Sequence, residues 1–196
     1  MTLEELLKRT SETAYAEPET PLHNQLIEQL LPEFETTLPR ASNVLDVGCG
    51  ACYAAKKFRD AGHTVLAASI LPAEVEAAKA MGFEAAQMDM HNIYFDGRFD
   101  CVWMRHVIEH SPVPLLVLVK AWRALKPGGV LYLEVPAPDT ACHHERNGNH
   151  WSVLPMSVWA ELLTRSGFVE TKARTISFKV LPGDDTYFQF VAKRPA

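Results

Sequence analysis

The seven residues Val44–Gly50 constrain this chain more than any other part of its sequence. They read Val-Leu-Asp-Val-Gly-Cys-Gly, a short aliphatic strand with an acidic residue, Asp46, that turns through two glycines toward a helix. Glycines at such a turn let a ligand approach the backbone closely, and the helix that follows directs its first N–H groups at the ligand. The dinucleotide pattern G-x-G-x-x-G would need a third glycine where Tyr53 stands, so the loop predicts a nucleoside ligand and disfavours NAD.

The chain after Asn43 alternates between strand-like and helix-like segments. We predict strands at 43–47, 64–69, about 84–88, 99–103 and 129–135, with helices at about 51–61, 73–81 and 113–125. This alternation is typical of βαβ units in a parallel sheet. A helix at 155–166 is followed by two extended runs, 168–178 and 186–192, which predict an antiparallel hairpin.

Residues 1–40 predict a helical cap in front of a single domain of residues 41–196. Apolar residues recur at helical spacing in two groups, which are Leu3, Leu6 and Leu7, then Leu26, Ile27, Leu30 and Leu31. Pro18 and Pro21 mark a break between the two groups. A chain of 196 residues can bury one sizeable core, so no second domain is needed.

From the glycine loop almost to its end, the chain resembles the class I S-adenosylmethionine-dependent methyltransferases of small single-domain type. The resemblance implies an α/β, Rossmann-like seven-stranded sheet in the order 3-2-1-4-5-7-6, with strand 7 antiparallel and helices on both faces. It also implies S-adenosylmethionine as the cofactor and S-adenosylhomocysteine as the product. The family often has another glycine at the position of Cys52, so the loop departs slightly from the usual pattern.

Ligands of open α/β sheets bind at the carboxyl ends of the strands, so the resemblance assigns cofactor contacts to each strand end. In the family, the acidic residue of the first loop approaches the methionine end of the cofactor, and the glycines leave room for that moiety. The predicted cofactor-binding residues are Asp46, Gly48, Cys49, Gly50, Ser69, Ile70, Asp89, Met90 and Met104.

The second and third strand ends differ in how well they match the family. Ser69 stands where the family usually has an acidic residue for the ribose hydroxyls. A hydroxyl lacks charge-assisted strength, so either cofactor affinity is modest or another group compensates. Asp89 and Met90 match the segment that reads adenine; alternatively, Asp89 only caps the following turn.

The fourth strand end, Phe99–His110, resembles the family's F-D-x-V strand followed by a Glu-His pair. That pair is structural in many members. In the ubiquinone-pathway O-methyltransferases and the small-RNA 2′-O-methyltransferases, however, an E-x-x-E-H segment binds a divalent metal that holds the acceptor oxygens. In this chain His106 replaces the first glutamate. Because residues three and four apart share one side of a helical turn, His106, Glu109 and His110 are candidate metal ligands, although we favour the structural alternative.

The segment 136–151 is polar and ends in Trp151, and it holds His143, His144 and His150. Loops on a rigid scaffold often carry binding groups, so this segment is either a substrate lid or an ordinary solvated loop. Methyl transfer from a sulfonium depends on alignment and desolvation, and a base is needed only for a weakly acidic nucleophile. Imidazoles titrate near neutral pH, and the candidates for that base are His106, His110 and His150.

Composition limits the partners of the chain. A net charge of −5 offers no general footprint for bulk nucleic acid or an anionic membrane, and no apolar run approaches the roughly 20 residues of a membrane span. The start lacks a signal peptide, and the four cysteines form no disulfide framework. We therefore expect a cytoplasmic monomer or homodimer that methylates a small-molecule or glycan acceptor, most simply at oxygen.

Two other interpretations remain open. Ser69 and Cys52 would also suit a noncatalytic S-adenosylmethionine-binding module, or an inactive partner of a true methyltransferase. Cys49 and Cys52 form a C-x-x-C, but a zinc site would need a second pair of ligands, so the simpler interpretation is two small residues in a tight turn.

Overall fold

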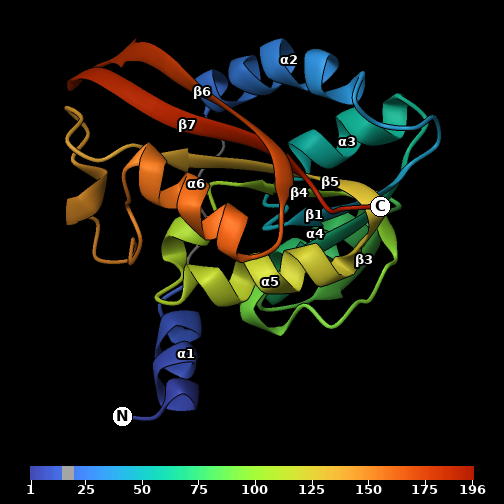
Figure 1. The fold of residues 1–196 in the computed structure, drawn as a ribbon, viewed down its shortest axis with the longest axis horizontal. Coiled ribbons are helices and arrows are strands. Elements are labelled where there is room, and N and C mark those ends of the chain that lie inside the picture. The colour runs from blue at the N-terminus through green and yellow to red at the C-terminus, as the bar shows by residue number, and fades with distance from the viewer. Residues whose placement is uncertain (15–19) are drawn as a thin grey trace.

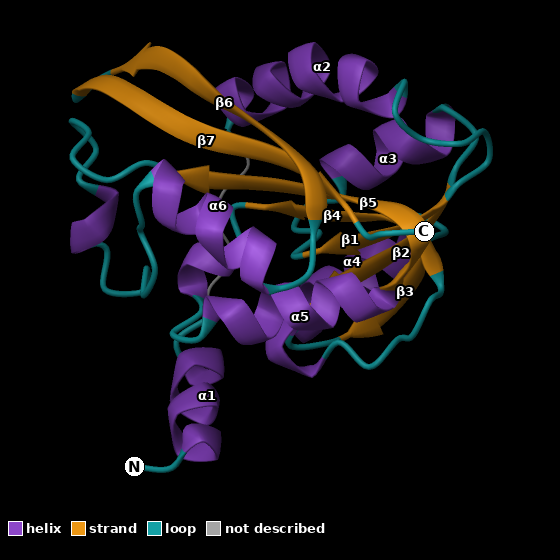
Figure 2. Cartoon of the chain, viewed as in Figure 1, coloured by secondary structure: helices purple, strands orange, loops and turns teal. Residues whose placement is uncertain are grey.

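The computed structural model describes residues 1–14 and 20–196, and the predicted break at Pro18 lies outside these ranges. A seven-stranded sheet in the order β3-β2-β1-β4-β5-β7-β6 forms its centre (Figures 1 and 2). The strands are β1 Asn43–Val47, β2 Thr64–Ser69, β3 Glu84–Gln87, β4 Phe99–Arg105, β5 Leu125–Pro136, β6 Val169–Val180 and β7 Gly183–Lys193. Strands β1 to β5 pair in parallel, and β7 is antiparallel to both neighbours, which confirms the predicted order.

Helices cover both faces of the sheet, as predicted (Figure 2). They are α1 Leu3–Glu12, α2 Pro21–Glu35, α3 Tyr53–Asp60, α4 Pro72–Ala80, α5 Pro114–Ala124 and α6 Met156–Arg165, with short 3-10 turns η1 Met90–Asn92, η2 Ile108–His110 and η3 His144–Arg146. Helices α2, α3 and α4 pack on one face, and α5 and α6 pack on the other. Within the described residues, no helix is both long enough and apolar enough to cross a membrane.

Burial explains why the inner strands read as continuous apolar runs. In β1 the last four residues are buried, and in β2 the last five are buried, because these strands carry helices on both faces. Strand β6 lies at the edge of the sheet and alternates between exposed and partly buried positions. The carboxyl ends of β1, β2 and β4 are thereby held rigidly at one edge of the sheet.

The two N-terminal helices differ in their packing. Helix α2 begins at Pro21, after a side-chain cap from Thr20, and buries five apolar residues on the sheet, Leu26, Ile27, Leu30, Leu31 and Phe34. Helix α1 is closed at its start by a capping box between Thr2 and Glu5, yet it buries no residue and projects from the body of the molecule (Figure 1). Its last turn borders the pocket described below.

Strands β4 to β7 are longer than the sequence predicted. Strand β4 continues to Arg105, two residues past its predicted end, and β5 begins at Leu125, before the Pro-Gly-Gly segment. The ladder between the two strands is irregular between Phe99 and Cys101, which accommodates that segment. The hairpin turns tightly at Leu181 and Pro182, so both of its strands are longer than predicted.

Candidate functional site

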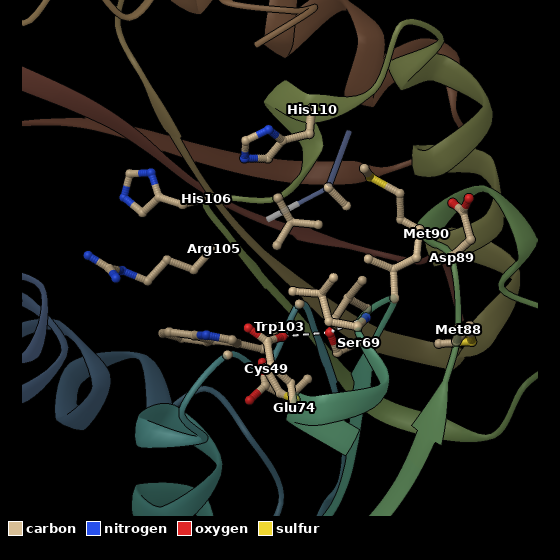
Figure 3. Close-up of a pocket in the computed structure, with 18 of the residues that line it drawn as sticks. Cys49, Ser69, Glu74, Met88, Asp89, Met90, Trp103, Arg105, His106 and His110 are labelled. Atoms are coloured by element: carbon tan, nitrogen blue, oxygen red, sulfur yellow. Dashed lines mark hydrogen bonds between the residues drawn. The ribbon is translucent and has the colours of Figure 1, made fainter. Parts of the chain in front are cut away.

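A pocket opens at the carboxyl ends of β1, β2 and β4 and extends to the start of α2 (Figure 3). The predicted site residues that line it are Asp46, Gly48, Cys49, Gly50, Ser69, Ile70, Asp89, Met90, His106 and His110. Met88, Asp89 and Met90 lie at one end in Figure 3, and Arg105 and His106 lie at the other. The glycine loop lies between the two ends, where it can serve both.

The glycine loop contains left-handed backbone conformations, and at Gly48 it has no room for a side chain. Gly48 has φ +72°, and a Cβ on it would lie 2.3 Å from a methyl carbon of Val107. Cys52 also adopts the left-handed conformation, with φ +60°, and its side chain is fully buried. This conformation explains why relatives often have glycine at that position, and it shows that cysteine can adopt the same turn.

Asp46 is a buried acidic residue, and one of its carboxylate oxygens has no hydrogen-bond partner among the described residues. Its side chain is 3% exposed, and Oδ2 is buried without a hydrogen-bond partner in the described part of the chain. Burial raises the pKa of Asp46 to about 7, because the charged form loses its hydration. A cationic ligand group beside this carboxylate would satisfy the free oxygen, as the ammonium group of a methionine moiety can.

Ser69 lines the pocket, and its hydroxyl is hydrogen-bonded to two neighbours. Its Oγ donates to Oε2 of Glu74 at 2.6 Å and accepts the backbone N–H of Leu71 at 3.0 Å. Glu74, in the first turn of α4, lines the pocket itself and is drawn beside Ser69 in Figure 3. A carboxylate five residues after Ser69 is therefore held at the pocket by the Ser69 hydroxyl.

We expect Glu74→Gln to weaken the binding of S-adenosylhomocysteine about tenfold, because a neutral amide forms weaker hydrogen bonds to ribose hydroxyls than a carboxylate does. The matched control is Glu76→Gln on the same helix, whose side chain is 71% exposed and pairs with Lys79. Calorimetric titration measures both affinities. Equal affinity in the two variants would show that Glu74 does not contact the cofactor.

Asp89 caps a turn and also borders the pocket. Its Oδ1 accepts the backbone N–H of His91 at 2.8 Å and lies 2.6 Å from Nδ1 of the same residue, while the other ring nitrogen contacts Ser111. The capping alternative is therefore observed. Since these bonds use only Oδ1, the cap is compatible with adenine recognition through Oδ2.

Three predicted residues, Met104, Glu109 and His150, lie outside the pocket lining. Met104 is fully buried in the core under α5 and α6, because successive residues of β4 face opposite sides of the sheet and its neighbours Trp103 and Arg105 line the pocket. We therefore remove the side chain of Met104 from the predicted contacts. His150 lies behind the lining residues Asn149 and Trp151.

His106 occupies a buried network of charged residues. It has φ +53°, its Nδ1 is 3.4 Å from Glu109, and its Nε2 is 3.2 Å from Glu134. Burial lowers the pKa of this imidazole, but hydrogen bonds to the two carboxylates raise it by more, so the net shift is upward. Both ring nitrogens of His106 therefore lie next to carboxylates.

Glu134 and Arg105 complete this network. Glu134 is fully buried, and its Oε1 is 2.7 Å from Nε of Arg105. Burial raises the pKa of Glu134, but Arg105 and His106 lower it to about 2. Nη2 of Arg105 is buried without a hydrogen-bond partner among the described residues. The pocket thus ends in a guanidinium that has an unused donor.

The predicted metal ligands are rearranged in the structure. The ligand atoms of Glu109, His110 and His150 all lie within 4.8 Å of one another, and His106 does not belong to this group. Glu109 is 1% exposed, and its Oε2 has no hydrogen-bond partner in the described chain. The carbonyl of Glu109 accepts the N–H groups of Trp151 and Ser152, which brings His150 to the 3-10 turn.

Sequence reasoning missed Glu74, Arg105 and Glu134. Glu74 had no signal, because it looks like an ordinary acidic residue in the first turn of a helix. Glu134 sits in an apolar run, and a lone acidic residue in a predicted buried strand is a usable sign of a charged partner. Arg105 lies two residues past the predicted end of its strand.

The sequence of the chain is similar to those of known methyltransferases. A family described as a methyltransferase domain matches residues 20–170. The ubiquinone biosynthesis O-methyltransferase of Xanthomonas oryzae pv. oryzae (strain PXO99A) is 33% identical over 100 residues, which cover 47% of this chain and 42% of that protein. Its counterpart from Xanthomonas axonopodis pv. citri (strain 306) is 30% identical over 124 residues, covering 59% and 52%. The chain thus spans about half the length of these curated relatives.

Solved structures share the fold. A putative methyltransferase from Bacillus halodurans C-125 has a TM-score of 0.72 at 20% identity and covers 86% of this chain and 100% of its own. A SAM-dependent methyltransferase from Archaeoglobus fulgidus has a TM-score of 0.74 at 14% identity and covers 98% and 100%. Together with the match over residues 20–170, these findings show that the chain belongs to the methyltransferase domain family, with the fold of the class I S-adenosylmethionine-dependent enzymes.

Proposed function

We propose that this protein transfers a methyl group from S-adenosylmethionine to a hydroxyl group of a small molecule. The observation that carries the proposal is Asp46, a buried carboxylate with an oxygen that has no hydrogen-bond partner among the described residues, two residues before Gly48, which has no room for a side chain. Acidic groups at the next two strand ends, Glu74 and Asp89, suit the ribose and the adenine of the same ligand. When bound, the cofactor supplies an electrophilic methyl group on a sulfonium.

The acceptor is expected at the end of the pocket where Arg105 and His106 lie. Trp151 and His110 border the pocket from the C-terminal side, and the last turn of α1 borders it from the N-terminal side. These aromatic side chains and the end of α1 would keep water away from the reacting groups. A site without water favours displacement at a sulfonium. Oxygen as the nucleophile is supported by the printed names of the Xanthomonas relatives, which are O-methyltransferases.

His110 is the residue that we assign as the base. Its Nδ1 is 3.0 Å from the carbonyl oxygen of Asn149, which orients the ring, and the ring packs against that of His150 at 4.9 Å. An imidazole oriented in this way can accept a proton from an acceptor hydroxyl. His106 would instead act through its charge, since it bridges Glu109 and Glu134.

A noncatalytic cofactor-binding module is the alternative. The contacts of Ser69 and the backbone of Cys52, the two residues that favoured this alternative, argue against it. Ser69 was the strongest departure from the family, and Glu74 restores a carboxylate beside it. Cys52 adopts the backbone conformation that a glycine would adopt there. The alternative would still predict cofactor binding, but it would predict no methyl transfer to any acceptor.

The proposal is tested by incubating the full chain with S-adenosylmethionine and pooled catechols, phenols, hydroxylated metabolites and sugars, with release of S-adenosylhomocysteine as the readout. We expect turnover with at least one hydroxylated pool, and loss of that turnover in the Gly48→Ala variant. Tight cofactor binding without turnover on any pool would favour the noncatalytic module. Absence of cofactor binding would overturn the proposal.

The alternative to a base at His110 is a divalent metal beside the pocket, which Glu109, His110 and His150 would hold, with His110 as a ligand. The buried, unpartnered Oε2 of Glu109 and two nearby imidazoles form a donor set that divalent transition metals accept. If a metal orients the acceptor, we expect a chelator to lower methyl transfer at least about tenfold and added metal to restore it, with unchanged cofactor affinity.

The variant Glu109→Gln should reproduce the effect of the chelator. The matched control is Glu145→Gln in the neighbouring loop, where the carboxylate pairs only with His143 among the recorded ion pairs. Activity that is indifferent to the chelator and retained in Glu109→Gln would leave Glu109 with the structural role seen in its backbone contacts to Trp151 and Ser152.

The proposal also covers the compartment, the acceptor class and the oligomeric state of the protein. The four cysteines are free, which suits a reducing compartment such as the cytoplasm. A glycan acceptor stays within the proposed class, because sugar hydroxyls are weakly acidic and would need the base that His110 offers. A monomer or a homodimer is expected in solution.

A further inference from the structure

A second cluster of metal-ligating side chains lies away from the pocket described above. Cys142 and His144 belong to the loop between β5 and α6, and Asp185 lies near the start of β7. Their sulfur, imidazole nitrogen and carboxylate oxygen all lie within 4.8 Å of one another. Nε2 of His144 is 3.0 and 3.1 Å from the two carboxylate oxygens of Asp185. Two donors that bind zinc tetrahedrally at roughly 2.1 Å are about 3.4 Å apart, so these side chains are close to ligating positions.

Asp185 is the buried member of the cluster. Its side chain is 3% exposed, while Cys142 and His144 are partly exposed, so an ion can reach the cluster from solvent. Oδ1 also accepts the backbone N–H of Thr186 at 2.8 Å. Burying a carboxylate is costly without a cation, and among the described residues the recorded ion pair of Asp185 is with His144 rather than with lysine or arginine.

The backbone holds the two segments of the cluster together. The N–H of Ala137 donates to the carbonyl of Thr186 at 2.9 Å, and the N–H of Ala141 donates to that of Asp184 at 3.1 Å. A Cβ on Gly183 would lie 2.8 Å from the Cβ of Ala141, so the missing side chain lets the loop pack against the hairpin. The three donors are thereby preorganised by contacts that do not depend on them.

We propose that Cys142, His144 and Asp185 bind a zinc-class divalent cation that fastens this loop to β7. A thiolate, an imidazole and a carboxylate suit zinc or cobalt and do not suit magnesium or calcium, which take oxygen ligands. Water supplies the fourth ligand on the exposed side. The cluster differs from Glu109, His110 and His150 in containing sulfur.

The cation would also position His150, which lies between the pocket-lining residues Asn149 and Trp151 in the sequence. The carbonyl oxygen of His144 is 3.0 Å from Nδ1 of His150, and the two rings stack with centroids 6.0 Å apart. His150 in turn packs against His110. A metal on His144 would therefore restrict His150 and hold the loop beside the pocket.

The test uses cobalt as a probe, because a thiolate bound to cobalt gives an intense charge-transfer absorption that oxygen and nitrogen ligands do not give. We expect the metal-free full chain to develop this absorption with one equivalent of cobalt and to lose it on adding zinc. Cys142→Ser and His144→Asn should each abolish it. His143→Asn is the matched control, since this neighbouring imidazole is outside the cluster. Cys49→Ser should keep the absorption, which separates the cluster from the C-x-x-C.

Thermal unfolding supplies a second readout. A ligand that binds only the folded chain raises the melting temperature, so saturating zinc should raise it by several degrees in the wild type and in His143→Asn. The rise should be absent in Cys142→Ser. Absence of the thiolate absorption in the wild type, or its persistence in both Cys142→Ser and His144→Asn, would overturn the proposal.

Discussion

The variant Gly48→Ala should lose measurable affinity for S-adenosylhomocysteine, by at least about a hundredfold. The added Cβ would lie 2.3 Å from Val107, and alanine at φ +72° adds a backbone cost of roughly 1–2 kcal/mol. The loop can relieve both only by moving, and the loop is what would receive the methionine moiety. Calorimetric titration of the folded variant measures the effect.

The matched control is Gly62→Ala. Gly62 also has a positive φ, +92°, but a Cβ there meets nothing within 4 Å, and the residue lies in the turn between α3 and β2. This variant should lose about 1 kcal/mol of stability and keep its cofactor affinity. Comparable loss of affinity in both variants would mean that general destabilisation, and not the site, explains the effect of Gly48→Ala.

The variant Asp46→Asn should weaken cofactor binding and yet stabilise the cofactor-free protein near pH 8. The pKa of Asp46 is raised from an ordinary 3.8 to about 7 by burial. The folded state therefore holds the proton more tightly than the unfolded state does. This contribution to stability is fully present below about pH 4 and is lost as the pH rises through about 7.

The size of the effect follows from the same shift. A shift of about three pKa units corresponds to roughly 4 kcal/mol, as an upper figure, that the wild type loses between about pH 4 and pH 8 and the variant keeps. Urea unfolding at both pH values gives the difference in stability between the two proteins. A difference that does not change with pH would contradict a buried Asp46 with a raised pKa, and unchanged cofactor affinity would remove Asp46 from the site.

The glycine loop and the alternating elements were predictable because both follow from local rules, and the strand order followed from the family resemblance. Aliphatic runs between turn residues indicate buried parallel strands, and glycine in Val44–Gly50 indicates a turn that a side chain would block. The position of the Glu74 carboxylate beside Ser69 was not predictable. It depends on the distance between the end of β2 and the first turn of α4, which no sequence pattern states.

The acceptor end of the pocket was harder to predict for a related reason. Glu134 reaches His106 through pairing between β4 and β5, and His150 reaches Glu109 through backbone contacts of a long loop. Residues at helical spacing were candidate ligands of one metal, but His106 bridges Glu109 and Glu134, and His150 joins Glu109 and His110 instead. Tertiary contacts, rather than spacing, therefore decide which histidines lie together.

A structure of the full chain with S-adenosylhomocysteine tests the central claim most directly. The account predicts the amino acid moiety of the ligand beside Asp46 and Gly48, the ribose on Glu74 rather than on Ser69, and the adenine next to Asp89. A ligand bound elsewhere, or a ribose that contacts Ser69 while Glu74 points away, would contradict it.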